Sequence, residues 1–112
     1  MTINIRAVGM ELTPAIRSYT EDKFSSLEKF EGSIMHIDID IGMETHHHHK
    51  GEIFTCSATL QLPKDVLKVE KKEEDLYKAI DKVKDHLREI LVEKKERVRD
   101  DHRRNTGKTE EM

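Results

Sequence analysis

The chain of 112 residues is poor in several residue types, and each shortage excludes a class of protein. It has no Trp, two Tyr and three Phe, so aliphatic side chains must fill the interior of the one domain that this length allows. Its single Cys excludes an internal disulfide, and no apolar run approaches the roughly 20 residues of a membrane-spanning helix. Arg6 and Glu11 interrupt any apolar core of a signal peptide. We therefore expect a reduced, soluble, cytoplasmic protein.

Alternating apolar and polar residues predict strands, and the alternation is strictest between Met35 and Met43. The predicted strands span residues 2–8, 35–43, 53–62 and 66–70. Pro63 and Asp65 favour a tight turn before the last of them. With residues 45–51 as a hairpin loop, the last three strands are expected to form an antiparallel meander.

Capping residues and apolar residues at helical spacing predict two helices. Thr13 and Pro14 suit the N-cap and the first position of a helix over residues 13–31, and Gly32 in a left-handed conformation would end it. A second helix is predicted from residue 73 to residue 100, where an acidic start complements the helix dipole.

The predicted order β-α-β-β-β-α indicates an α+β fold. In it, a four-stranded sheet carries both helices on one face and exposes its other, polar face to water. Residues 1–99 are expected to form the domain. Residues 100–112 lack any periodicity and are predicted to be a flexible charged tail.

The overall charge argues against the simplest polyanion-binding protein, because 20 Lys and Arg stand against 23 Asp and Glu and the formal net charge is -3. On a helical projection of the last helix, however, four cations cluster beside the apolar stripe: Lys84, Arg88, Lys95 and Arg99. Such an edge can bind phosphates. It can equally be the solvated side of a helix whose charges pair with their neighbours, and the pattern alone leaves both interpretations open.

Lys23 falls within the apolar arc of the first helix, between Tyr19 and Leu27, so its side chain must reach the rim of the core to expose its ammonium group. Either its aliphatic stem packs against the core, or it presents a cation to a ligand. By pattern alone, Arg17 and Lys29 are ordinary exposed charges of the same helix.

Four consecutive imidazoles occupy the predicted hairpin loop, at His46, His47, His48 and His49. Imidazoles suit zinc, nickel and copper, but four adjacent residues cannot converge tetrahedrally on one ion. An exposed polar hairpin, a loop that contacts RNA or responds to pH, and a metal site are the three interpretations. We assign no metal ligands on this pattern.

Motifs that carry catalysis are missing, since the chain has no Gly-rich phosphate loop, no nucleophile elbow and no paired metal motif. Cys56 lies at an inward position of its predicted strand, where a buried small apolar residue is expected rather than a nucleophile. We therefore expect a protein that is not an enzyme and that needs no cofactor.

Several segments, taken together and in order, resemble the ribosome hibernation promoting factor family, whose members are also called ribosome-associated inhibitors or ribosomal subunit interface proteins. The segments are NIRAVGMELTPAIRSYTEDKFSSLEKF, HHHHKGEIFTCSATLQLP and VLKVEKKEEDLYKAID. The likeness covers residues 2–88 and fits a short form, because 112 residues leave no space for the C-terminal domain with which long members pair ribosomes.

The resemblance implies a fold similar to double-stranded RNA-binding domains and a partner, the small ribosomal subunit with its 16S-type rRNA. Members of the family occupy the mRNA/tRNA channel and silence idle ribosomes under stress or in stationary phase. Six residues are thereby implied to contact RNA: Lys23, Lys29, Lys84, Arg88, Lys95 and Arg99. The histidine loop is a possible further contact, and no DNA, membrane or small-molecule substrate is expected.

The chain departs from the family in the segment DHLREILVEK, where His86, Glu89 and Glu93 replace residues that are commonly cations. This departure and the acidic balance favour, as an alternative, a protein-protein adaptor on the same scaffold. The histidines suggest a further alternative, a metal-responsive loop protein.

Overall fold

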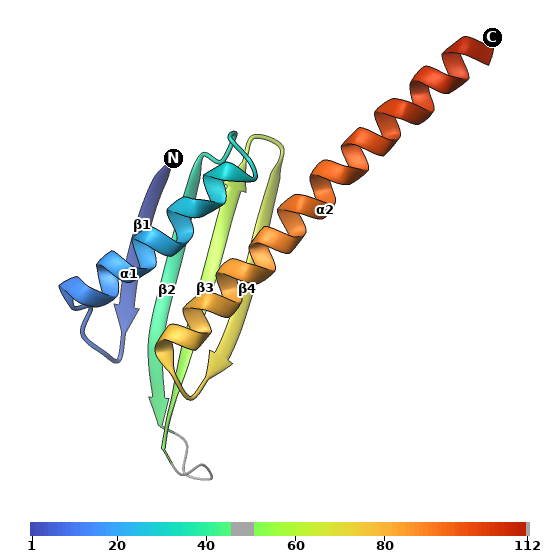
Figure 1. Ribbon diagram of the computed structural model, residues 1–112. Coiled ribbons are helices and arrows are strands. Elements are labelled where there is room, and N and C mark those ends of the chain that lie inside the picture. The colour runs from blue at the N-terminus through green and yellow to red at the C-terminus, as the bar shows by residue number, and fades with distance from the viewer. Residues whose placement is uncertain (46–50, 112) are drawn as a thin grey trace.

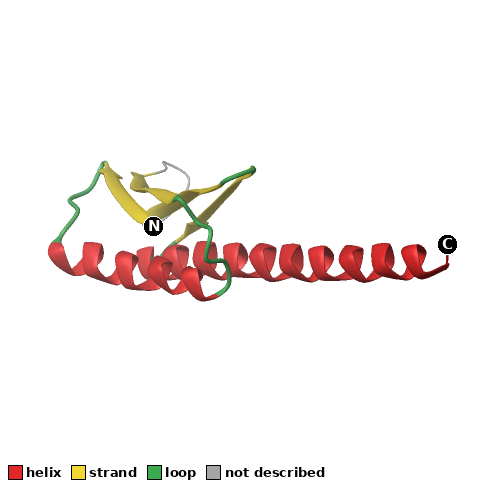
Figure 2. Ribbon diagram, turned by 90° about the horizontal axis from the view of Figure 1, so that it is seen from above, coloured by secondary structure: helices red, strands yellow, loops and turns green. Residues whose placement is uncertain are grey.

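The computed structural model describes the backbone of residues 1–45 and 51–111 and the side chains of residues 1–44 and 51–97. It shows one sheet covered on a single face by two helices (Figures 1 and 2). The elements follow the predicted order β-α-β-β-β-α. They are β1 (Thr2–Val8), α1 (Pro14–Ser25), the short 3-10 helix η1 (Ser26–Lys29), β2 (His36–Thr45), β3 (Glu52–Leu62), β4 (Asp65–Glu73) and α2 (Leu76–Glu111).

The strands lie in the order β1-β2-β3-β4, with β1 parallel to β2 and the other neighbours antiparallel. A parallel pair needs a crossover, and α1 provides it by packing on the face that α2 also covers. The antiparallel meander of the last three strands is confirmed. The sheet is therefore mixed, with β1 and β4 as its edges.

The core lies between the sheet and the helices, as the period-two pattern predicts. Ile37, Ile39 and Ile41 of β2 are almost completely buried, and they belong to the same buried cluster as Val83 and Leu87 of α2. The opposite face of the sheet carries polar side chains and is covered by neither helix (Figure 2). This confirms the expected layer arrangement.

The first helix begins where the capping residues place it, because the Thr13 hydroxyl accepts the N–H of Ile16 at 3.2 Å and Pro14 follows. Its predicted end is wrong. The helix tightens into η1, and the Phe30 N–H donates to the Leu27 carbonyl at 2.9 Å. Positive φ angles occur, among the described glycines, at Gly9 and Gly51 and not at Gly32.

Other boundaries differ from the predictions at segment ends. Met35 lies before β2 and is 54% exposed, so the alternation overestimates that strand by one residue at its start. The second helix begins later than residue 73, because the Asp75 carboxylate accepts the N–H of Tyr77 at 2.8 Å and acts as its cap. The helix continues to Glu111, because the backbone hydrogen bonds of a helix do not require an apolar period in the sequence. The flexibility of residues 100–112 stays a prediction.

No described helix is both long and apolar enough to cross a membrane.

Candidate nucleic-acid interface

One side of α2 faces α1 and η1, which lie beside it over the same face of the sheet (Figure 1). Residues on that side recur every three or four positions, the spacing that shares one helix face. They are Tyr77, Asp81, Lys84, Arg88, Val92 and Lys95. Contacts with α1 near the start of this row and with η1 near its end show that the whole row faces the first helix.

At the start of the row, Asp81 joins the two helices. The Tyr19 hydroxyl donates to Asp81 Oδ1 at 2.7 Å, and Lys23 Nζ lies 3.4 Å from the same oxygen. The Lys23 ammonium is also 5.4 Å from the Tyr19 ring centroid, a cation-π distance. The rings of Tyr19 and Tyr77 pack edge to face, with their centroids 4.6 Å apart. Lys23 is thus held at the helix interface with 39% of its side chain exposed.

In the middle of the row, Lys84 is largely covered and Arg88 is exposed. Only 17% of the Lys84 side chain is accessible, and its Nζ lies 3.5 Å from Asp85 Oδ1 on the same helix. Arg88 forms no ion pair with any carboxylate that the structure describes. The guanidinium therefore provides an uncompensated charge at the centre of the row.

At the end of the row, η1 and α2 enclose a depression of about 180 Å³. Its lining residues are Lys29, Phe30, Val92, Lys95 and Glu96. Neither lysine forms an ion pair within the described part of the chain. The pKa of the nearby Glu31 carboxyl is lowered mainly by hydrogen bonds from Ser33, and the Lys95 charge adds to that effect.

The structure therefore brings together five of the predicted residues, which we call the cationic stripe: Lys23, Lys29, Lys84, Arg88 and Lys95. Carboxylates pair with Lys23 and Lys84, whereas Lys29, Arg88 and Lys95 have no such partner among the described side chains. The side chain of Arg99 and residues His46, His47, His48 and His49 lie outside the described residues. The part these residues take in RNA binding stays a prediction.

The residues that depart from the family pattern lie on the other side of α2. His86 and Glu89 line a depression that they share with Lys71 of β4, away from α1. Glu93 is exposed and follows Glu89 by one helical turn. These substitutions therefore leave the cationic stripe unchanged.

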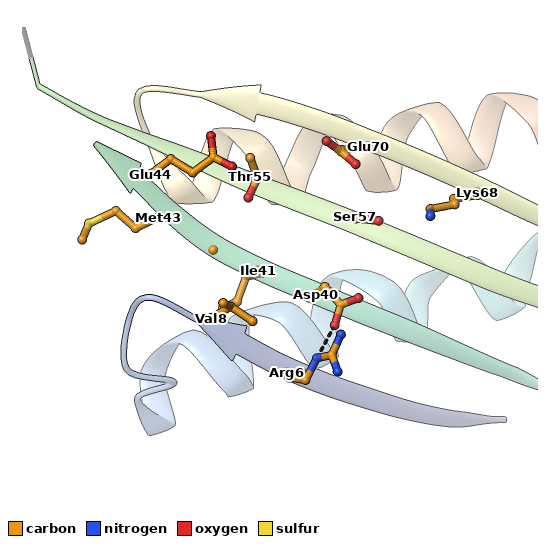
Figure 3. Close-up of a pocket in the computed structure, with 11 residues that line it drawn as sticks. Arg6, Val8, Asp40, Ile41, Met43, Glu44, Thr55, Ser57, Lys68 and Glu70 are labelled. Atoms are coloured by element: carbon orange, nitrogen blue, oxygen red, sulfur yellow. Dashed lines mark hydrogen bonds and ion pairs between the residues drawn. The ribbon is translucent and has the colours of Figure 1, made fainter. Parts of the chain in front are cut away.

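The open face of the sheet carries a second, shallower surface, a depression of about 390 Å³ (Figure 3). Arg6 Nε of β1 pairs there with Asp40 Oδ1 of β2 at 2.9 Å, and Lys68 and Glu70 lie on β4, at the opposite edge of the sheet. Gly42 lies at the centre of the depression and contributes no side chain. A Cβ at this position would lie 3.2 Å from the Thr55 hydroxyl oxygen. Charges of both signs are mixed on this face.

Catalytic and metal chemistry find no support in the described residues. No group of three or more described His, Cys, Asp or Glu side chains could hold a metal ion. Cys56 is buried, and desolvation raises the pKa of its thiol to about 12, with the Asp40 charge adding to the effect. Cys56 is therefore an inert core residue, as its inward position predicts.

Sequence reasoning missed the residues that position the cations. Asp81, which holds both Tyr19 and Lys23, was treated only as part of a family segment. Its spacing of four from Tyr77 signals a shared face. Val92, which lines the depression with Lys29 and Lys95, was also missed, because it lies beside the buried apolar stripe of α2 rather than within it.

The Tyr19–Asp81 hydrogen bond can be tested by titration. It is the main cause that raises the pKa of Tyr19 from 10.0 to about 12, followed by burial and by the Asp81 charge. In a Tyr77→Phe variant, the remaining tyrosine is expected to ionise near 12 by ultraviolet absorbance. Adding Asp81→Ala is expected to bring that pKa back toward 10.0, and an unchanged titration would contradict the contact.

Comparison with known proteins gives a consistent result. The family described as Sigma 54 modulation protein / S30EA ribosomal protein matches residues 3–99. The chain is similar to the ribosome hibernation promotion factor of Bacillus subtilis (strain 168), with 26% identity over 98 residues, 88% of this chain and 50% of that protein. It is also similar to the ribosome hibernation promoting factor of Escherichia coli (strain K12), with 27% identity over 99 residues, 88% of this chain and 98% of that protein.

Among solved structures, a ribosomal subunit interface protein from Coxiella burnetii superposes with a TM-score of 0.74 at 23% identity, over 85% of this chain and 98% of that one. That likeness supports the fold. The chain spans about half the length of the Bacillus relative and nearly all of the Escherichia one. None of these names is that of an enzyme, in agreement with the expectation of a non-catalytic protein.

Proposed function

Because the chain belongs to the family described as Sigma 54 modulation protein / S30EA ribosomal protein, we propose that it is a ribosome hibernation factor that binds the small ribosomal subunit. It acts by occupying the mRNA/tRNA channel and excluding both RNAs, so that inhibition is steric and involves no bond making or breaking. The protein would work in the cytoplasm on idle ribosomes under stress or in stationary phase.

The observation that carries this proposal is the cationic stripe. A chain with a net charge of -3 can bind RNA through a local excess of cations. Lys29, Arg88 and Lys95 provide such an excess on the helical face, where Glu96 is the one carboxylate that lines the depression between the two lysines. Screening over about 8 Å at physiological salt keeps this face electrically separate from the open face of the sheet.

The stripe also fits the kind of RNA recognition proposed here. Lysine and arginine side chains on rigid helices contact phosphates and respond to the shape of folded RNA rather than to its sequence. The Asp81 contacts hold Lys23 of α1 against α2, the helix that carries Arg88. Packing of α1 against α2 therefore presents cations from two segments of the chain to one RNA surface.

Co-sedimentation with purified small subunits over a salt series tests the proposal. Each neutralised phosphate contributes about 0.7–0.9 to the slope of log affinity against log salt, so three unpaired cations predict a slope of about -2 to -3. Subunits already loaded with mRNA and tRNA are expected to bind much less protein, because the channel is filled. Binding that is absent at low salt, or unaffected by salt and by mRNA and tRNA, would refute the proposal.

A protein-protein adaptor is the second candidate, and the observation in its favour is the mixed-charge depression on the open face of the sheet. It predicts that Arg6→Glu on this face, rather than Arg88→Glu, removes a partner that survives nuclease treatment. Loss of all captured material after nuclease treatment would exclude this candidate.

A further inference from the structure

The depression between η1 and α2 differs from the other surface depressions described above in the chemistry of its lining. Phe30 and Val92 give it an apolar surface, and Lys29 and Lys95 add positive charges from opposite sides of the helix junction. The depression beside β4 has no apolar lining residue. In the depression on the sheet face carboxylates outnumber cations three to two, whereas here two lysines stand against the single carboxylate of Glu96. An apolar surface next to paired cations is suited to a ligand that is flat and apolar in one part and anionic in another.

Val92 is one of the apolar side chains that the core leaves exposed. Leu87 and Leu91 on the neighbouring face of α2 are buried in the core, whereas Val92 is 37% exposed and lies outside it. Phe30 packs partly against the core and also lines the depression. The two apolar side chains of the depression are therefore held on helical elements, η1 and α2.

We propose that this depression, the η1–α2 pocket, binds a single unstacked nucleotide of RNA. The base lies against Phe30 and Val92, and the adjoining phosphates are bound by Lys29 and Lys95. Base contact with an aromatic ring and phosphate contact with nearby cations are the two elements of single-stranded RNA recognition. This inference rests on the proposed function and deepens it, because it identifies where the protein distinguishes an unpaired nucleotide from a helical one.

Charge complementarity favours a nucleotide over an apolar protein side chain as the occupant. A protein side chain would use the apolar lining and leave the lysines without partners, whereas the sugar-phosphate backbone places an anion on each side of a base. Arg88 lies on the same face of α2, two turns before Lys95, and can contact the continuing backbone.

Glu96 gives the pocket a preference among bases. Its carboxylate accepts hydrogen bonds and cannot donate them, so it pairs with an exocyclic amino group. Adenine, cytosine and guanine carry such an amino group on the Watson–Crick edge, whereas uracil offers only its N3–H there. The pocket is therefore expected to prefer an amino-bearing base to uracil.

The test uses the full chain and labelled single-stranded oligoribonucleotides, with fluorescence anisotropy as the readout. Val92→Glu places a carboxylate in the apolar lining and is expected to weaken oligoadenylate binding about 5- to 100-fold, the range for loss of one stacked base. The matched control is Val66→Glu on the open face of the sheet, where Val66 is 52% exposed. This variant is expected to bind like the parent protein.

Two further probes separate base contact from charge. An oligonucleotide with an abasic site in place of the bound nucleotide is expected to bind weakly to the parent protein. Because the base is already missing, Val92→Glu should lower its affinity only a little further. Glu96→Gln, whose amide can both donate and accept, is expected to remove the preference of oligoadenylate over oligouridylate. Equal losses for intact, abasic and duplex RNA would overturn the pocket, because simple repulsion of phosphates predicts that result.

The small-subunit assay distinguishes failure of the pocket from failure of the proposed function. The pocket is refuted, and the function stands, if the parent protein binds subunits in a salt-dependent way while Val92→Glu and Val66→Glu bind oligonucleotides with the same affinity. Specific, base-dependent oligonucleotide binding without subunit binding supports the pocket and refutes the function. Circular dichroism and thermal unfolding establish that both variants are folded.

Discussion

Arg88→Glu is expected to weaken binding to the small ribosomal subunit by about 10- to 100-fold, the range for losing a hydrogen bond between charged groups. Arg88 lies at the centre of the cationic stripe and has no carboxylate partner among the described side chains, so its charge is available to a phosphate. The substitution also places a carboxylate beside Lys84, where it offsets a second cation of the stripe. The measurement is co-sedimentation at low salt and at physiological salt.

The matched control for this change is Lys68→Glu on the open face of the sheet. It alters the net charge of the chain by the same amount, on an exposed residue that lies on the face opposite the helices. Its affinity should fall only slightly, through the long-range field. If the two variants lose affinity equally, net charge rather than the stripe controls binding, and the proposed RNA surface is wrong.

Phe24→Ala is expected to lower the free energy of unfolding by about 3–5 kcal/mol, a large part of the roughly 5–15 kcal/mol of a small domain. Phe24, a residue of α1, is fully buried and is one of the largest side chains in the core. Removing its ring leaves a cavity that the rigid β1-α1-β2 crossover cannot close. Urea unfolding followed by circular dichroism measures the loss.

Two companion variants show whether the cavity is responsible. Phe24→Leu keeps most of the apolar volume and should lose less stability than Phe24→Ala. Val66→Ala truncates a side chain that is 52% exposed on the open face and should leave the unfolding midpoint nearly unchanged. A loss below about 1 kcal/mol for Phe24→Ala would contradict its placement in the core.

Local patterns predicted the strands of this protein and the start of its first helix. Alternation at Ile37, Ile39 and Ile41 indicates a half-buried strand because successive side chains point to opposite faces of a sheet. Thr13 and Pro14 mark a helix start because a hydroxyl acceptor and a residue without an N–H both suit the first turn. Helix ends were less predictable, since the helix that was expected to stop at Gly32 already tightens into η1 after Ser25.

The sequence also identified Lys84, Arg88 and Lys95 as one edge of a helix, because their spacing depends only on the helical repeat. It could not show that Lys23 and Lys29 join them. That juxtaposition depends on α1 packing beside α2, through a hydrogen bond between Tyr19 and Asp81, which are 62 positions apart in the chain. Single-sequence patterns report neighbours along an element, whereas contacts between elements arise from the packing of the whole core.

The same distinction separates what the chain's composition indicates from what the folded protein presents. The charge count describes an acidic molecule, but it does not show where in the fold each charge lies. Tertiary structure decided that Lys29 and Lys95 flank an apolar depression and that His86 and Glu89 face β4 instead. The physical reason is that a charge acts over a few ångströms, so its neighbours in space, which only the fold supplies, determine what it can bind.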